Sequence, residues 1–125
     1  MSEATILVVD DEEDLAYNLA DFLELEGFTV CVHLSGEEAL KSVESQKPDL
    51  ALLDIQLTGI SGLEVLQKLK EKYPLTPVVM VSASSQKGTR EKVDEYGADA
   101  LILKPYDQDE LLNLINRLLQ GRNIS

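Results

Sequence analysis

The chain has 125 residues, a formal net charge of −12 at pH 7 and a hydrophobic fraction of 44%, which fits one ordinary globular domain. No apolar run approaches the roughly 20 residues that a membrane span needs, and neither a secretory signal nor a second cysteine for a disulfide is present, so a reducing cytoplasm is the expected location. The negative charge repels phosphate backbones and argues against direct binding of nucleic acid.

Two strands and two helices are expected in the first part of the chain. Thr5 to Val9 is a short apolar, β-branched run, which predicts a strand. The next stretch repeats apolar residues at helical spacing and ends near Gly27, a residue type favoured just after a helix. A second strand is expected at about Thr29 to Leu34. A second helix follows from Ser35, because its spacing to Glu38 matches a capping box.

A strand that is apolar on both faces lies in the middle of the chain. Leu50 to Ile55 contains one polar residue, Asp54, and such strands belong in the interior of parallel sheets. A loop with two glycines follows, and then a third helix that ends near Tyr73. Pro77 to Val81 predicts the fourth strand.

The last third predicts two helices and one strand. A short polar helix is expected at about Thr89 to Tyr96, with Gly97 as its cap, followed by a strand at Ala100 to Leu103. Asp107 is expected to open the last helix, which should end at Gly121. We therefore expect one domain over residues 1–120 and a C-terminal tail over residues 121–125.

Five strands that alternate with five helices predict an α/β fold of the (βα)5 type. Right-handed crossovers turn this order into a doubly wound, five-stranded parallel sheet with helices on both faces, as in flavodoxin-like folds. Ligands bind such sheets at the carboxyl ends of the strands, so residues at those positions are the candidates for chemistry.

Polar residues stand at the ends of four predicted strands. Asp10 and Asp11 follow the first, Asp54 ends the third, Ser82 follows the fourth and Lys104 follows the fifth. Clustered carboxylates raise one another's pKa unless a cation neutralises them, and hard oxygen ligands favour Mg²⁺ or Mn²⁺. An aspartate can also attack phosphorus to form an acyl phosphate, with cations around the phosphoryl oxygens.

Each of these residues also has an ordinary structural explanation. Adjacent aspartates after a strand can cap the next helix, and Asp54 can be a turn residue. Ser82 and Lys104 alone would be a loop serine and a surface lysine. Because all of them fall at the same edge of one predicted sheet, a shared site explains them better than coincidence.

The sequence resembles the receiver domains of two-component response regulators over about residues 4–120. The resemblance depends on a set of short motifs rather than on one. They are Ile6-Leu7-Val8-Val9-Asp10-Asp11-Glu12, Pro48-Asp49-Leu50 with Asp54, Gly62-Leu63-Glu64, Ser82-Ala83, Gly97-Ala98 and Leu103-Lys104-Pro105-Tyr106.

The resemblance implies a metal site built from four residues. Asp11 and Asp54 would bind Mg²⁺ directly, the backbone carbonyl of Gln56 would be a further ligand, and Asp10 would hold a metal-bound water. Mg²⁺, or Mn²⁺ in its place, would thus be the cofactor.

The resemblance also implies how the phosphoryl group is received. Asp54 would accept it from a phosphohistidine on a histidine kinase or a histidine phosphotransfer domain. Lys104 would pair with Asp54 and then with the phosphoryl group, and Ser82 would hydrogen-bond a phosphoryl oxygen. Gln56 and Ser84 would flank the attacking water and set the lifetime of the phosphoryl group. Such a domain is a signalling switch and not an enzyme, apart from weak self-phosphotransfer and self-dephosphorylation.

Two positions depart from the common family pattern. Thr58 stands where proline is frequent, which should loosen the loop because proline would fix φ. Leu101 stands where many relatives carry a switching aromatic residue, so the coupling from Ser82 to the far face would need another route. The far face is the one made by the fourth helix, the fifth strand and the fifth helix. It is expected to control an unknown downstream protein or to form a phosphorylation-dependent homodimer.

Two other functions stay open from the sequence. A phosphorylation-independent interaction module would lack the acidic pair or the lysine, and both are present here. A metal phosphohydrolase would need a general acid and a substrate pocket beyond the cluster. The output, the cognate kinase and whether the chain is stand-alone, a relay or a domain of a longer regulator cannot be read from these residues.

Overall fold

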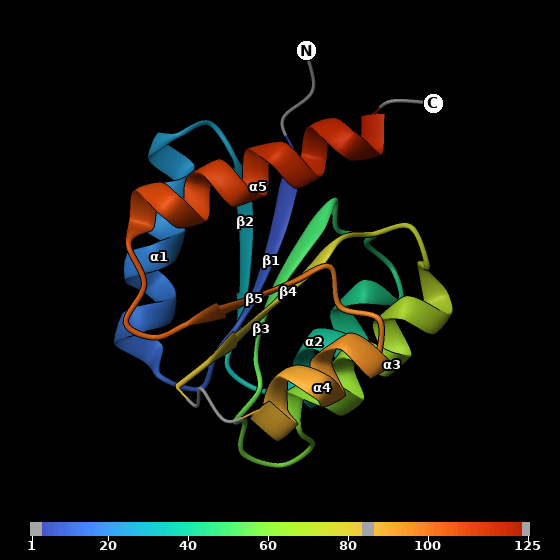
Figure 1. Ribbon diagram of the computed structural model, residues 1–125. Coiled ribbons are helices and arrows are strands. Elements are labelled where there is room, and N and C mark those ends of the chain that lie inside the picture. Colours follow the sequence, from blue (N-terminus) through green and yellow to red (C-terminus); the bar gives the residue numbers. More distant parts are fainter. Residues whose placement is uncertain (1–3, 84–86, 124–125) are drawn as a thin grey trace.

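Figure 1 shows the computed structural model of the chain, which describes residues 4–83 and 87–123. Strands and helices alternate throughout, as the hydrophobic pattern predicted. The elements are β1 (Thr5–Val9), α1 (Glu13–Leu25), β2 (Thr29–His33), α2 (Gly36–Val43), β3 (Leu50–Asp54), α3 (Gly62–Lys72), β4 (Val78–Ser82), α4 (Lys87–Glu95), β5 (Ala100–Leu103) and α5 (Gln108–Asn123).

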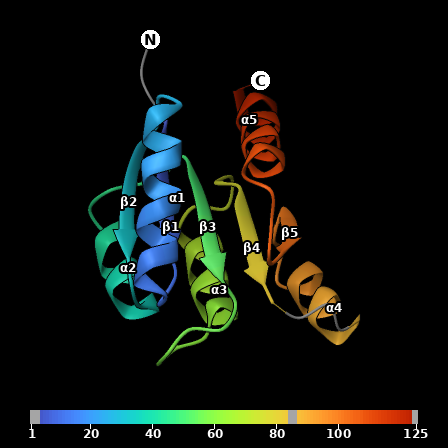
Figure 2. The ribbon, with the colours of Figure 1, turned by 90° about the vertical axis from the view of Figure 1, so that its left-hand side faces the viewer.

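The five strands form one parallel sheet in the order β2-β1-β3-β4-β5. In Figure 2 the arrows of β2, β3 and β4 run in the same direction. β2 lies on one side of β1, and β3, the next strand along the chain, lies on the other side. The predicted fold class is therefore confirmed, and the β1/β3 boundary is the switch point where such sheets bind ligands.

Two apolar clusters, one on each face of the sheet, hold the layers together. Alternate residues of β1 and β3 point to opposite faces, since successive strand residues alternate. Buried side chains of α1 and α5 cover one face, and those of α2, α3 and α4 cover the other (Figure 1). β3 and β4 are buried along their whole length, as expected for interior strands.

Most helix ends agree with the predicted caps. Gly27 and Gly97 have φ values of 100° and 88°, a region that glycine enters without steric cost. The Ser35 hydroxyl accepts the Glu38 amide at 3.2 Å, which satisfies one of the free N–H groups of the first turn of α2. None of the helices in the described ranges is both long enough and apolar enough to cross a bilayer.

The end of the last helix was predicted wrongly. α5 continues through Gly121 to Asn123, whereas a helix end at Gly121 was expected. Gly121 does not have the positive φ of a capping glycine, and glycine within a helix costs only about 1 kcal/mol relative to alanine. Packing of the preceding residues Ile115 and Leu119 on the sheet outweighs that penalty. The short α4 begins at Lys87, slightly before the expected Thr89.

Candidate functional site

Four of the predicted site residues meet at the carboxyl edge of the sheet. Asp54 is the last residue of β3 and Ser82 the last of β4, and both are buried. Asp10 directly follows β1, and the Lys104 amide donates to the Ser82 carbonyl at 2.8 Å. Parallel pairing of β1, β3, β4 and β5 thus brings together residues that are up to 94 positions apart in the chain.

Lys104 is the centre of the charge arrangement. Its Nζ lies 2.9 Å from Asp54 Oδ2, 3.4 Å from Asp10 Oδ2 and 3.4 Å from Glu12 Oε1. The Lys104 and Asp54 side chains are 15% and 6% exposed, so this ion pair is shielded from water. The pairing of Lys104 with Asp54 that the resemblance implied is present.

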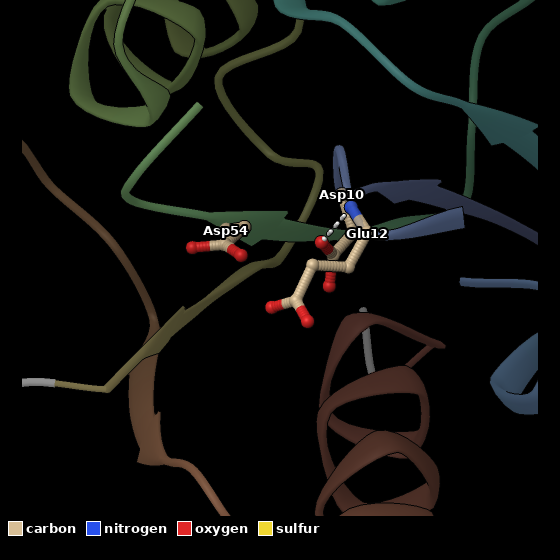
Figure 3. Close-up of side chains that lie close together, drawn as sticks. All are labelled: Asp10, Glu12 and Asp54. Carbon is tan, nitrogen blue, oxygen red and sulfur yellow. Dashed lines mark hydrogen bonds between the residues drawn. The ribbon is translucent and has the colours of Figure 1, made fainter. Parts of the chain in front are cut away.

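Asp10, Glu12 and Asp54 form a cluster of carboxylates, drawn in Figure 3. One oxygen from each lies within 4.8 Å of the others. Glu12 was not among the predicted site residues, and its side chain is 61% exposed. It nevertheless reaches the cluster, because it precedes α1 and its carboxylate turns toward Lys104 instead of capping the helix. Its position directly after the Asp10-Asp11 pair is the one sequence signal for it.

Asp11 lies outside this cluster. Its Oδ2 accepts hydrogen bonds from the Thr58 amide at 3.2 Å and from the Thr58 hydroxyl at 2.9 Å. Thr58 was expected to loosen its loop. Instead it ties the loop after β3 to the loop after β1, with a backbone N–H that proline would lack. Direct metal binding by Asp11 stays a prediction.

Local hydrogen bonds fix the two aspartates of the cluster. The Gln56 amide donates to Asp54 Oδ1 at 2.9 Å, and the Glu12 amide donates to Asp10 Oδ1 at 2.9 Å. Each is a bond from the amide two residues later, a turn that aspartate favours. Asp10 thus orders the turn before α1 without capping the helix, which has no side-chain cap hydrogen bond at its N-terminus, while its other oxygen faces Lys104.

Gly62 lets the first turn of α3 lie against the end of β3. A Cβ at this position would overlap the carbonyl oxygen of Asp54 and would lie 2.8 Å from the Cα of Ile55. The Gly62 amide donates to the Ile55 carbonyl at 3.0 Å. Only glycine fits here without moving the strand that carries Asp54, which explains this member of the sequence motif.

The charges at the site perturb one another. Burial raises the pKa of the Asp10 carboxyl, and the negative charge of Asp54 raises it further against the opposing effects of the Glu12 amide and Lys104. Burial alone would lower the pKa of Lys104, but its hydrogen bond to Asp54 and the charges of Asp54 and Asp10 outweigh burial and raise it. Burial, followed by the charge of Asp10, also raises the pKa of Tyr106.

The donor set fits a hard divalent cation. Three carboxylates face a single lysine, so two negative charges are left uncompensated when all three are ionised. All the side-chain donors are oxygens, and sulfur and imidazole are absent from the cluster. Oxygen ligands at this charge favour Mg²⁺ or Mn²⁺ over zinc.

An apolar groove of about 590 Å³ lies beside the acidic cluster. Leu15, Pro105 and Tyr106 line it, and so does Lys104. Leu15 is 41% exposed. An apolar rim thus lies between the start of α1 and the loop that leads into α5.

The comparisons with known proteins agree with this geometry. The family model "Response regulator receiver domain" matches residues 6–116. This chain belongs to that family. As a receiver domain of a two-component system, it is part of a family of signalling proteins rather than of enzymes.

The relatives and solved structures cover nearly the whole chain. It is 36% identical to the "Alkaline phosphatase synthesis transcriptional regulatory protein PhoP" of Bacillus subtilis, over 96% of this chain and 50% of that protein. It is 31% identical to the "DNA-binding transcriptional regulator NtrC" of Escherichia coli, over 95% of this chain and 25% of that protein. A CheY-like receiver domain from Methanospirillum hungatei superposes with a TM-score of 0.94 at 31% identity, over 97% of both chains. The chain thus spans half or less of the length of these two curated relatives.

Three further residues were predicted to affect the switch or the lifetime of the phosphoryl group. Leu101 is half-buried and packs against the apolar cluster under α2, α3 and α4. Ser84, predicted to flank the attacking water, lies outside the described residues. Gln56 is exposed beside Asp54, with its amide bonded to the Asp54 carboxylate.

Proposed function

We propose that this receiver domain accepts a phosphoryl group on Asp54 from a phosphohistidine of a histidine kinase or histidine phosphotransfer domain. The observation that carries the proposal is the buried Asp54 carboxylate, held 2.9 Å from Lys104 beside two further carboxylates. A structural ion pair needs one carboxylate for one lysine, and the excess acid at this edge is better explained by a cation-dependent reaction.

The side chains divide the work of the reaction. An oxygen of Asp54 attacks phosphorus, so an oxygen–phosphorus bond forms while the bond from phosphorus to the donor histidine nitrogen breaks, and that nitrogen keeps the electron pair. Lys104 pairs with the Asp54 carboxylate before the reaction and with the phosphoryl oxygens after it. Ser82, at the adjacent strand end, donates a hydrogen bond to one of these oxygens.

The cofactor in this proposal is Mg²⁺, or Mn²⁺ in its place. Asp11, Asp54 and the Gln56 backbone carbonyl are its direct ligands, and Asp10 holds a water bound to it. When bound, the ion neutralises the carboxylates and the incoming phosphoryl oxygens. The oxygen-only donor set and the excess of two negative charges support a hard divalent cation at this edge of the sheet.

The phosphodonor docks at the apolar groove beside the site. The groove is open to Lys104 and lined by Leu15, Pro105 and Tyr106. An apolar helix face of the donor seated there would place its histidine next to Asp54. We expect this encounter in the cytoplasm, without direct involvement of nucleic acid or membrane.

The output is a shift in the population of the face made by α4, β5 and α5, which controls a downstream protein or a homodimer. Leu101 cannot repeat the swing of an aromatic ring, so backbone movement after Ser82 carries the signal. Gln56 and Ser84 set the phosphoryl lifetime. Replacing both should change the dephosphorylation half-life, and an unchanged half-life would contradict their role.

The direct test is phosphoryl incorporation from a small phosphodonor, measured by intact-protein mass spectrometry with and without Mg²⁺. The wild-type chain should gain one phosphoryl group only when Mg²⁺ is present, and Asp54→Asn should gain none. Incorporation into Asp54→Asn would move the acceptor elsewhere. No incorporation into the wild type would favour the phosphorylation-independent interaction module, and turnover of a phosphomonoester would favour the phosphohydrolase.

A further inference from the structure

The hydrogen bonds between Thr58 and Asp11 have a consequence for metal binding. Both donors of Thr58, its amide and its hydroxyl, point to the same oxygen of Asp11, at 3.2 Å and 2.9 Å. Asp11 is predicted to be a direct metal ligand, yet it is absent from the group of carboxylates that converge within 4.8 Å among the described residues. Thr58 and the metal therefore compete for one carboxylate.

Thr58 is held in place by the rest of its loop. On its C-terminal side, the Ile60 amide donates to Glu37 Oε2 at 3.3 Å, which ties the loop to α2. The Gly62 amide donates to the Ile55 carbonyl at 3.0 Å, which closes the loop on itself. Asp11 and Thr58 are both exposed, but Asp11 lies in the short segment before α1. When the two part, we expect the Asp11 side chain to move and the Thr58 loop to stay.

Charge explains why such a restraint is favourable. Three carboxylates already share Lys104, and a fourth would add repulsion without adding a positive partner. Two hydrogen-bond donors at Thr58 satisfy the Asp11 carboxylate at a place where it does not join this cluster. A divalent cation reverses the balance, because it attracts all of the carboxylates at once.

We propose that Thr58 is a positioning residue that holds Asp11 out of the acidic cluster and thereby weakens the affinity of the receiver domain for Mg²⁺. This inference rests on the proposed function, since it takes Asp11 as a metal ligand. It assigns Thr58 no contact with the metal or the phosphoryl group. Its prediction is that loss of the Thr58 hydroxyl strengthens Mg²⁺ binding, whereas loss of a residue that supports the site would weaken it.

The test compares Mg²⁺ affinity, measured by isothermal titration calorimetry, in the wild type, Thr58→Val and Thr58→Ser. Valine has the shape of threonine without the hydroxyl, and we expect it to lower the Kd for Mg²⁺ by about two- to tenfold, the value of one hydrogen bond to the carboxylate. Serine keeps the hydroxyl and should restore a Kd within about twofold of the wild type. A Kd that is unchanged or raised in Thr58→Val overturns the inference.

A second readout uses unfolding stability. Thr58→Val should lower the stability measured in EDTA and leave it unchanged at saturating Mg²⁺, because the lost bond exists only while Asp11 is away from the metal. Thr76→Val is the matched control. Its buried hydroxyl lies 3.4 Å from the Pro48 carbonyl at the opposite edge of the sheet, so stability should fall in both conditions without a change in Kd.

A double-mutant cycle tests whether the effect passes through Asp11. In an Asp11→Ala background, Thr58→Val should no longer strengthen Mg²⁺ binding. Tighter binding that persists in this background overturns the inference. Failure of the wild type to bind Mg²⁺ overturns both the inference and the proposed metal site, while normal wild-type binding with no effect of Thr58→Val overturns the inference alone.

Discussion

The amino edge of the sheet, where the parallel strands begin, and the carboxyl edge, where they end, both carry a lysine paired with aspartate. The two pairs serve different purposes. At the amino edge, Lys70 Nζ lies 2.8 Å from Asp99 Oδ2 and donates to the Thr76 carbonyl at 2.8 Å. The same Asp99 oxygen accepts the Val78 amide at 2.8 Å. One positive charge meets one negative charge, and every group in this small network has a partner. This arrangement ties α3 to the starts of β4 and β5.

At the carboxyl edge, Lys104 meets three carboxylates instead of one. The excess negative charge favours the binding of a cation. Burial raises the pKa of Asp10, and the negative charge of Asp54 raises it further. A lysine–aspartate contact alone therefore says little about function. The balance of charge around the lysine separates a structural link from a reactive site.

The largest expected difference between the edges comes from removing each lysine. Lys104→Ala should reduce phosphoryl incorporation at Asp54 by about a hundredfold or more, because it deletes the cation that balances the phosphoryl oxygens. Lys70→Ala should leave the rate of incorporation unchanged and lower the unfolding stability. Incorporation rates from a small phosphodonor, with stability from urea unfolding, check both. An equal loss of rate in the two variants would erase the proposed distinction.

The next expected effect concerns Asp99. Asp99→Ala leaves the Val78 amide without its acceptor and the Lys70 ammonium with only the Thr76 carbonyl, which should cost about 1–3 kcal/mol of unfolding stability. The change in stability caused by saturating Mg²⁺ should equal that of the wild type. Urea unfolding with and without Mg²⁺ measures both quantities, and a reduced Mg²⁺ effect would mean that the two edges are coupled.

Particular residues show how much of this was readable from the sequence. Asp10, Asp54, Ser82 and Lys104 were placed correctly, because their positions follow from strand ends and parallel pairing, which hydrophobic periodicity reveals. Asp11 lies outside the cluster of converging carboxylates, and Glu12, which was not among the predicted site residues, lies in it. They are neighbours in a loop, and the direction of a loop side chain depends on backbone dihedrals and on partners such as Thr58 that periodicity does not encode.

The smallest expected effect concerns Asp10 and reverses the usual sign of a mutation at a site. A carboxyl whose pKa is raised in the folded state binds its proton more tightly there than in the unfolded chain. The folded state therefore loses stability as the pH rises from 3.8, the ordinary pKa of the carboxyl, through its raised pKa in the folded state. The loss persists at neutral pH. Asp10→Asn stays neutral and can still accept the Glu12 amide.

We therefore expect Asp10→Asn to raise the unfolding stability in EDTA at pH 7, while Asp99→Asn at the amino edge lowers it. The gain should shrink as the pH falls toward 4, because the Asp10 carboxyl of the wild type becomes protonated and loses its repulsion with Asp54. Saturating Mg²⁺ should also remove the gain, since the ion compensates the same charge. Thermal unfolding of both variants at pH 4 and pH 7, with and without Mg²⁺, separates these cases. A destabilised Asp10→Asn in EDTA would mean that Lys104 already balances this edge, and that the difference between the two edges lies in geometry rather than in charge.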